Sequence, residues 1–332
     1  MIIKSIKLTN FRNHSNYSLV CDDNTSLILG ENGSGKTSVL EAIYVSTRGK
    51  SFRATDSEIV KTGTNFYRIE LEYENGEKII TFYDGKNKTF SILDKKTKRL
   101  PKNYKYPVVL FLPSDLNLIS HSPGRRRDYF DRVFSEFEEK YSQDLLKYEK
   151  TLKQRNELLK DEHSLPETFF SWNLMLAKYG ILICEKRKKF VQDINSFLTN
   201  TYHSIAENND QVEIIYQTDT DNISESSYLK KLEDNFTRDK YLGHTSFGIH
   251  RDDYIFYFNH KPADGSASRG EVRSIILALK FIEANLIYQK QQKKPLVLLD
   301  DVFSELDPTR RHYLVKNFKD HQVIITSVEA IS

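Results

Sequence analysis

Few cysteines, no long apolar run and little net charge limit what this 332-residue sequence can encode. Its two cysteines, Cys21 and Cys184, are far apart and show neither the paired spacing of a zinc site nor a disulfide framework. No segment approaches the roughly 18 uninterrupted apolar residues of a membrane-spanning helix, and the opening MIIKSIKLTNFRNH lacks the layout of a signal peptide. We therefore expect a soluble, cytoplasmic protein with no membrane partner.

Charge of one sign is also scarce, since 49 basic side chains face 46 acidic ones and leave a net charge of +3. Overall charge therefore gives no indication of a nucleic-acid partner, and an electropositive surface would have to come from local clusters. Candidate clusters are Arg125–Arg127 and the run EKRKK at 185–189. Such runs are more often solvated helix faces than binding sites. The length favours about two domains.

A phosphate-binding pattern is present in LILGENGSGKTSVLEAI, residues 27–43. Gly30, Gly35, Lys36 and Thr37 match G-x-x-x-x-G-K-[ST] between an apolar strand and the start of an amphipathic helix. Glycines let successive backbone N–H groups converge on phosphate, Lys36 is expected to reach the β- and γ-phosphates, and Thr37 is expected to ligate Mg²⁺. The alternative is a chance match in a glycine turn. The expected nucleotide-binding residues are Gly30, Glu31, Asn32, Gly33, Ser34, Gly35, Lys36, Thr37 and Ser38.

ATP is the better guess for the nucleotide. GTPases usually add a base-reading N-K-x-D motif, and the nearest candidate, residues 87–90, lacks its aspartate. Downstream, LVLLDD at 296–301 predicts a strand that delivers Asp300 to the metal and Asp301 to the attacking water. The alternative is a strand end capped by two solvated acids.

Hydrophobic periodicity predicts an interrupted α/β protein. Strands are expected near 6–8, 17–21, 67–73, 80–82, 108–112, 247–249, 254–258, 295–299 and 323–325, with turns at Asn75-Gly76 and Asp84-Gly85 that indicate an antiparallel meander. Residues from about 125 to 235 carry mostly helical stripes, 207–227 reads as a loop or weak strand, and a helix is expected over 271–290. We therefore expect a P-loop ATPase lobe, 1–120 with 236–332, interrupted by an all-helical lobe, 121–235.

Ser268-Arg269-Gly270-Glu271 precedes a strongly apolar helix and indicates first a capping box. A second interpretation is that Ser268 and the first N–H groups of the helix face an anion.

The order of these motifs resembles the ATP-binding-cassette heads of SMC and Rad50 proteins, with residues 267–271 in the place of the signature motif and Leu306-Asp307 in the D-loop. Further stretches make the chain similar, over nearly its whole length, to the RecF family of bacterial recombination-repair proteins. These stretches are LTNFRNH (8–14), FLPSDLNLISHSPGRRRDYFD (111–131), LKQRNELLK (152–160), GIHRDDYIF (248–256), ASRGEVRSIILALK (267–280) and LLDDVFSELDPTRR (298–311).

This resemblance implies an ABC-type ATPase that dimerises head to tail on ATP and Mg²⁺, binds double-stranded or gapped DNA, and releases it on slow hydrolysis. It also implies partners, RecR and indirectly RecO, in assisting RecA loading at single-strand gaps. Ser268, Arg269, Gly270, Glu271 and Asp307 would then act on the nucleotide of the other subunit.

The resemblance also assigns several basic residues. It places Arg12 near the nucleotide, and Arg48, Lys50 and Arg53 near DNA or the dimer face. Arg125, Arg126 and Arg127 are further DNA candidates, because guanidinium groups suit phosphate contacts. The alternative for Arg12, Arg48 and Arg53 is surface charge that contributes little, and the alternative for Arg125–Arg127 is a solvated helix start. For His250–Asp253 we favour a structural salt-bridge cluster over a catalytic role.

Departures from the wider pattern favour a slow timer over a motor. Other cassette ATPases usually carry Glu where Asp301 stands, Ser327 replaces the switch histidine, and no metal-contacting glutamine is evident around residues 113–115. Rival hypotheses are a transporter's nucleotide-binding subunit, a structural ATPase with a long coiled coil, and a DNA-binding scaffold whose ATP site is a static clamp.

Overall fold

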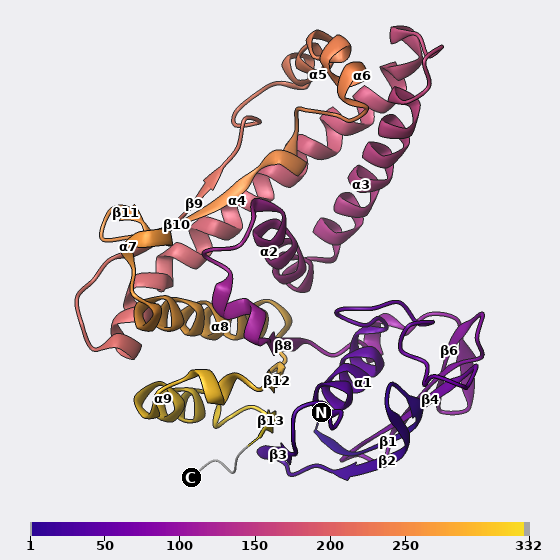
Figure 1. Ribbon diagram of the computed structural model, residues 1–332, viewed down its shortest axis with the longest axis vertical. Coiled ribbons are helices and arrows are strands. Elements are labelled where there is room, and N and C mark those ends of the chain that lie inside the picture. The colour runs from indigo at the N-terminus through magenta and orange to yellow at the C-terminus, as the bar shows by residue number, and fades with distance from the viewer. Residues whose placement is uncertain (1, 329–332) are drawn as a thin grey trace. The chain divides into compact units, whose positions relative to one another are not determined.

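The computed structural model describes residues 2–328 and forms two compact units (Figure 1). Unit 1 comprises residues 1–115 and 283–332, and unit 2 comprises residues 116–282. This division differs from the expected one mainly at its second boundary, which lies at 282/283 and not at 235/236. The reason is that strand β10 (Asp253–Phe258) pairs with β9 (Val212–Gln217), so the chain up to residue 282 stays with unit 2.

Unit 1 contains a six-stranded antiparallel sheet in the order β2-β1-β4-β5-β6-β7. Its strands are β1 (Ile3–Phe11), β2 (His14–Val20), β4 (Tyr67–Tyr73), β5 (Lys78–Tyr83), β6 (Lys88–Ile92) and β7 (Lys95–Thr97). In β4 the buried side chains alternate with half-buried ones, as the period of two requires for a sheet with one face on the core. The expected antiparallel meander is thereby confirmed.

Unit 1 also contains a parallel sheet in the order β3-β13-β12-β8. Its strands are β3 (Thr25–Leu29), β8 (Val108–Phe111), β12 (Leu296–Asp300) and β13 (Val323–Ser327). Every residue of β12 and β13 is buried, which fits the continuous apolar runs that were read as strands. In this order, β12, which ends in Asp300, is separated from β3 by β13, the last described strand of the chain.

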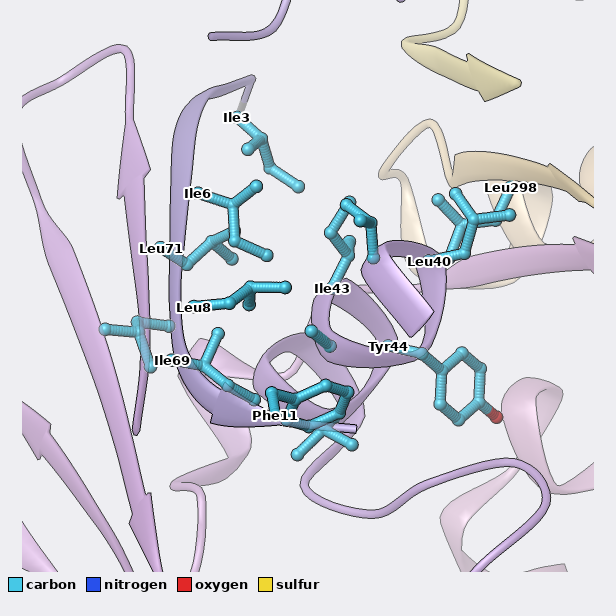
Figure 2. Close-up of a cluster of buried hydrophobic side chains, with 14 of the residues drawn as sticks. Ile3, Ile6, Leu8, Phe11, Leu40, Ile43, Tyr44, Ile69, Leu71 and Leu298 are labelled. Atoms are coloured by element: carbon cyan, nitrogen blue, oxygen red, sulfur yellow. The ribbon is translucent and has the colours of Figure 1, made fainter. Parts of the chain in front are cut away.

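Helix α1 (Lys36–Arg48) contacts strands of both sheets and is buried on almost every side. Figure 2 shows Ile43 of α1 facing Ile6 and Leu8 of β1, with Leu40 near Leu298 of β12. Burying each such aliphatic side chain contributes about 1.5–3 kcal/mol. The phosphate-loop helix is thus held by the core of unit 1 along its whole length. Unit 1 also contains η1 (Lys102–Tyr104), the first residues of η2 (Pro113–Asn117), η5 (Val302–Glu305) and α9 (Pro308–Phe318).

Unit 2 is mainly helical, and its long helices α3 and α4 run side by side (Figure 1). Its helices are α2 (Pro123–Phe137), α3 (Glu139–Leu159), η3 (Pro166–Phe169), α4 (Phe170–Ala206), α5 (Glu225–Asp234), α6 (Phe236–Leu242), η4 (Ile249–Arg251), α7 (Ala263–Ser266) and the first part of α8 (Arg269–Gln291). A three-stranded sheet, β11-β10-β9, with β11 at Lys261–Pro262, accompanies them. The part that was expected to be all-helical, residues 121–235, therefore includes one strand of this sheet, β9.

One expected strand is wrong. Phe247 and Ile249 are both buried, but Gly248 between them has φ 128°, and Ile249–Arg251 forms a 3₁₀ helix. A φ in this range is accessible to glycine and breaks the extended chain. Across residues 2–328, no helix combines the length and the apolar character needed to cross a bilayer.

Candidate nucleotide-binding site

The phosphate loop lies between the end of β3 and the first turn of α1, as predicted. Gly33 and Gly35 have φ of 84° and 100°, a region that favours glycine. A Cβ on Gly35 would also lie 2.5 Å from Asn13 Oδ1, so a side chain there would collide with the β1–β2 turn. That turn supports the loop, because Asn13 Nδ2 donates to the Gly33 carbonyl at 3.3 Å and His14 Nε2 lies 3.1 Å from the Gly35 carbonyl oxygen.

Lys36 is buried and reaches back over the loop. Its Nζ donates to the carbonyls of Gly30 and Glu31 at 2.7 and 3.1 Å, and lies 3.6 Å from Asp301 Oδ2. The ammonium group therefore stands inside the curve of the loop, where the N–H groups of the loop and of the α1 N-terminus favour an anion.

Thr37 and Asp300 come together, as expected for a shared metal. Thr37 Oγ1 lies 2.8 and 3.0 Å from the two carboxylate oxygens of Asp300. Thr326 of the intervening strand β13 donates to Asp300 Oδ1 at 2.9 Å. Burial raises the pKa of Asp300, and the charge of Asp301 raises it further, whereas the hydroxyls of Thr37 and Thr326 lower it. A cation bound here would favour the ionised carboxylate.

Asp301 follows at the end of β12 in a left-handed conformation, with φ 50°. Its backbone N–H donates to Thr326 Oγ1 at 3.0 Å. Its Oδ1 is buried and, within the described part of the chain, has no hydrogen-bond partner. A buried carboxylate oxygen without a partner is costly unless water or an ion satisfies it.

These residues suit Mg²⁺, which favours oxygen ligands and binds through one or two protein groups together with substrate phosphates. Residues 2–328 hold no group of three or more His, Cys, Asp and Glu side chains arranged for a metal. The hydroxyl of Thr37 and the carboxylate of Asp300 instead form the incomplete oxygen set that a nucleotide-bound magnesium needs.

A cavity of about 640 Å³ opens over the phosphate loop. Its lining includes six expected residues, Asn32, Gly33, Gly35, Lys36, Thr37 and Ser38, and Asp301. Of the other expected loop residues, Gly30 and Glu31 face the site through the carbonyls that hold Lys36. The N–H of Ser34 donates to the Glu31 carbonyl at 3.2 Å and so shapes the turn.

Two arginines from different segments also line this cavity. Arg12, in the β1–β2 turn with φ 54°, was expected near the nucleotide, and its side chain lines this cavity. Arg53 was expected near DNA or the dimer face, but its side chain lines the nucleotide cavity and is bound by Glu41 at 2.9 Å. Arg53 is therefore also a candidate residue of the nucleotide cavity, and its expected place near DNA or the dimer face stays a prediction.

The predicted signature residues form the capping box. The Ser268 N–H donates to Glu271 Oε2 at 2.6 Å, and the Glu271 N–H lies 3.3 Å from Ser268 Oγ. Ser268 and Arg269 are exposed at the start of α8, and Gly270 and Glu271 are half-buried. In the D-loop, the carboxylate of Asp307 caps α9 by accepting the Arg310 N–H at 3.0 Å.

The arginine triplet divides into different roles. Arg126 is buried and forms a bidentate ion pair with Asp253 at 2.7 and 2.6 Å, so its guanidinium is occupied within unit 2. Arg127 donates to the Asp252 carbonyl at 2.7 Å, while Arg125 is exposed. Of the other DNA candidates, Lys50 is exposed and Arg48 donates to the Tyr106 carbonyl at 3.3 Å.

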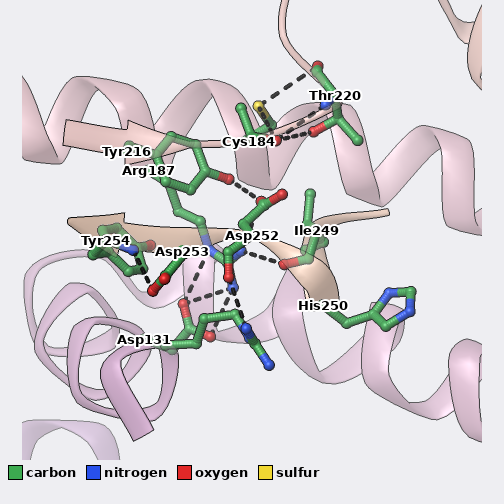
Figure 3. Close-up of polar contacts among 12 residues, drawn as sticks. Asp131, Cys184, Arg187, Tyr216, Thr220, Ile249, His250, Asp252, Asp253 and Tyr254 are labelled. Atoms are coloured by element: carbon green, nitrogen blue, oxygen red, sulfur yellow. Dashed lines mark hydrogen bonds and ion pairs between the residues drawn. The ribbon is translucent and has the colours of Figure 1, made fainter. Parts of the chain in front are cut away.

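Within the stretch 250–253, Asp252 belongs to a buried polar network around Arg187, which supports the salt-bridge interpretation (Figure 3), whereas Arg251 is exposed. Arg187, buried on α4, is bound by Asp131 at 2.7 Å and lies 3.2 Å from Asp252. Burial raises the pKa of Asp252 to about 6 despite Arg187, because Asp131 takes the bidentate share of that guanidinium. Burial lowers the pKa of His250 to about 4.

One candidate region was not selected from the sequence. Residues 84–107 contain eight basic and two acidic side chains, a local imbalance that a windowed charge count reveals. The exposed members are Lys86, Lys95, Lys96, Lys98, Arg99, Lys102 and Lys105. They lie on the β5–β6 turn, the β6–β7 hairpin and η1 of unit 1, and we refer to them as the basic hairpin surface.

Comparisons with known proteins identify the family of the chain. The AAA ATPase domain family matches residues 1–291. The DNA replication and repair protein RecF of Ruminiclostridium cellulolyticum is 35% identical over 346 residues, covering 98% of this chain and 92% of that protein. A solved structure of the recombination mediator protein RecF-ATP in the RecFOR pathway superposes with a TM-score of 0.86 at 30% identity, covering 99% of this chain and 92% of that one.

A more distant structure, an SMC head bound to the C-terminal winged-helix domain of ScpA, has a TM-score of 0.55 at 14% identity, covering 99% of this chain and 90% of that one, and shows likeness of fold alone. Together these matches confirm the expected ABC-type ATPase fold. This chain belongs to the RecF family of DNA replication and repair proteins.

Proposed function

We propose that this protein is an ATP-dependent DNA clamp. It binds ATP with Mg²⁺, dimerises head to tail on the nucleotide, holds double-stranded or gapped DNA, and releases it on slow hydrolysis. In the cell it assists RecA loading at single-strand gaps together with RecR and, indirectly, RecO. The observation that carries the ATP part is the convergence of Lys36, Thr37, Asp300 and Asp301 at a cavity of about 640 Å³.

The residues of the site have distinct tasks in this proposal. Lys36 binds phosphate oxygens in the curve of the loop, and Thr37 and Asp300 hold the magnesium, which neutralises phosphate charge. Asp301 orients the attacking water through the carboxylate oxygen that has no partner in the described residues. The fixed left-handed backbone and the N–H bond to Thr326 hold that carboxylate in place.

Slow turnover is supported by the side chain at position 301. An aspartate is one methylene shorter than the glutamate usual in this place, so it holds the water less closely, and positioning errors of about 1 Å can cost roughly 10²-fold in rate. The exposed Ser268 at the start of α8 and the D-loop Asp307 would complete the nucleotide site of a second subunit.

The basic hairpin surface, with Lys50 and Arg125, supports the DNA part of the proposal. Exposed lysine and arginine side chains attract the phosphate backbone without reading sequence. An alternative reason for lysines on the edge strand β7 is that they prevent edge-to-edge pairing of sheets. The double variant Lys95→Glu/Lys96→Glu separates the two. A DNA-contact role predicts weaker DNA binding and a shallower salt dependence, whereas edge protection predicts unchanged DNA affinity.

The first experiment measures duplex-DNA affinity with and without ATP and Mg²⁺ at one fixed salt concentration. We expect tight binding only with both, and we expect Lys36→Ala to abolish the ATP effect. Lys316→Ala, an exposed lysine of α9 outside the cavity, is the matched control. A wild-type DNA affinity that is the same with and without ATP would contradict the proposed clamp function.

A second candidate function is a scaffold whose ATP site is a static clamp. It shares the ATP-dependent DNA binding, so the discriminating measurement is release of inorganic phosphate. Steady phosphate release that disappears in Asp301→Asn would exclude the scaffold. No phosphate release at saturating ATP, Mg²⁺ and DNA would favour it.

A further inference from the structure

Glu41 is a fully buried carboxylate on α1, and the phosphate-loop pattern gives it no role. Its exposed fraction is 0%, and it lies one helical turn beyond Lys36 and Thr37. An ionised carboxylate in such a place is costly unless it is paired and hydrogen-bonded. The way it is satisfied connects it to the nucleotide cavity.

Five hydrogen bonds from two separate chain segments converge on this carboxylate. Arg12 of the β1–β2 turn binds both oxygens, with Nε 2.8 Å from Oε2 and Nη2 2.7 Å from Oε1. Arg53, in the loop after α1, binds Oε2 through Nη2 at 2.9 Å and Nε at 3.2 Å. Ser51 Oγ donates to Oε1 at 2.7 Å. Burial raises the pKa of Glu41, but these bonds outweigh it and hold the pKa below its ordinary value.

Both guanidinium groups bound by Glu41 line the nucleotide cavity beside Lys36 and Asp301. A guanidinium carries five N–H donors in a planar fork. In the described residues, contacts with Glu41 and with the Glu58 carbonyl, 3.0 Å from Arg12 Nη1, use three donors of Arg12 and two of Arg53. The other donors of each fork are available to a ligand in the cavity.

Without an anion between them, two guanidinium groups this close would repel each other and swing toward solvent, since the side chains of Arg12 and Arg53 are 24% and 40% exposed. The carboxylate also joins the β1–β2 turn to the loop at 51–53. Glu41 is the shared acceptor that fixes both forks.

We propose that Glu41 is a positioning residue of the nucleotide site, which holds Arg12 and Arg53 in the cavity so that their remaining N–H groups meet the phosphates. Glu41 itself does not touch the ligand. This inference rests on the proposed ATP-binding function and adds the residue that organises one wall of the site.

The test measures ATP affinity of the full-length protein by fluorescence of a labelled ATP analogue and by competition with unlabelled ATP. Glu41→Gln keeps the size of the side chain but removes the charge and turns two acceptor positions into donors. We expect the Kd for ATP to rise at least tenfold. Glu70→Gln is the matched control, because Glu70 also binds an arginine, Arg68 at 2.8 Å, but lies on β4 outside the cavity.

A double-mutant cycle distinguishes positioning from a purely structural role. If Glu41 acts through Arg53, then Glu41→Gln should weaken ATP binding much less in an Arg53→Gln background than in the wild-type background. A structural role instead predicts the same fold-loss in both backgrounds, and that result would overturn the proposal. Thermal unfolding by circular dichroism, recorded for every variant, identifies those that are folded.

Arg53→Gln and Arg12→Gln keep the proposal open to refutation even where Glu41→Gln fails to fold, because both side chains are partly exposed. If each folds and binds ATP like the wild type, Glu41 has nothing to position and the inference falls. If the wild-type protein itself does not bind ATP, the proposed function fails first. If the wild-type protein binds ATP and the folded Glu41→Gln variant binds it with the same affinity, only the inference about Glu41 is overturned and the proposed function stands.

Discussion

Replacing His250 by glutamine tests the buried polar network of unit 2 through its pH dependence. In the folded protein His250 Nε2 lies 2.9 Å from the Thr245 carbonyl oxygen, and Nδ1 lies 2.9 Å from the Tyr148 hydroxyl. The neutral imidazole satisfies both contacts by donating from Nε2 and accepting at Nδ1. Burial accordingly lowers the pKa of His250 from 6.5 to about 4, while the unfolded chain keeps the ordinary value.

The sign follows from which state binds the proton. Between about pH 6.5 and pH 4 the unfolded chain binds a proton at His250 and the folded chain does not, so acidification favours unfolding. The free energy of unfolding falls by about 1.4 kcal/mol for each pH unit between the two pKa values. The contribution of His250 is complete at pH 7, and about 2–3 kcal/mol of it is lost near pH 4.5. Asp252, whose raised pKa is about 6, has the opposite effect, because its contribution to stability falls as pH rises from about 4 to about 6. The two effects partly cancel in the pH dependence of the wild-type unfolding free energy, so the His250 contribution must be measured as a difference between wild type and variant.

The assay is urea unfolding followed by fluorescence of Trp172, the one tryptophan of the chain, on α4 of unit 2. We expect His250→Gln to destabilise the protein at pH 7, because the glutamine side chain replaces only one of the two hydrogen bonds that the imidazole ring makes. That destabilisation should shrink by about 2–3 kcal/mol near pH 4.5. An exposed histidine, His163, supplies the control variant His163→Gln. A difference between wild type and His250→Gln that stays constant with pH would refute the assignment of a buried neutral histidine.

Further substitutions test the site and the signature helix. Asp301→Asn tolerates the left-handed backbone and should trap the ATP-bound dimer, slowing DNA release after an ATP chase at least tenfold; release at the wild-type rate would argue against a role for this carboxylate in hydrolysis. Ser268→Arg removes the serine half of the capping box and places a bulky cation at an exposed helix start, so we expect a loss of stability similar to that of Glu271→Ala but no ATP-dependent dimer by sedimentation, and intact dimerisation would contradict action in trans. Glu271→Ala removes one half of the capping box and should lower the unfolding free energy by about 1 kcal/mol in urea, and no loss would show that the box contributes little to stability.

Features that depend on neighbouring residues were predictable from the sequence. The phosphate loop, the strand ending in Asp300-Asp301 and the capping box at Ser268 each involve a short run of residues with a defined backbone requirement. The antiparallel meander was equally legible, because turn dipeptides separate its alternating strands. These features locate the catalytic candidates within a few residues.

Features that depend on distant partners were not predictable. Arg126 was read as a DNA contact, but Asp253, 127 positions away in the chain, binds it. Glu41 looks like an ordinary polar position on a helix, and only the tertiary structure brings Arg12 and Arg53 to it. The strand expected at 247–249 failed for a related reason, since burial of Phe247 and Ile249 produced an apolar alternation without any partner strand. Periodicity reports burial, and burial does not specify backbone pairing.

The place of β13 between β3 and β12 has a consequence for protein synthesis. The phosphate loop is synthesised before Thr326, which binds Asp300 and the Asp301 N–H and follows about three hundred residues later in the chain. A nascent chain that has not yet produced β13 holds the nucleotide-binding residues without the strand that joins their two halves. The complete nucleotide site can therefore form only after β13 has been synthesised, and a ribosome stalled before residue 323 would display a chain that has the phosphate loop and the Asp300-Asp301 strand but lacks the Thr326 contacts.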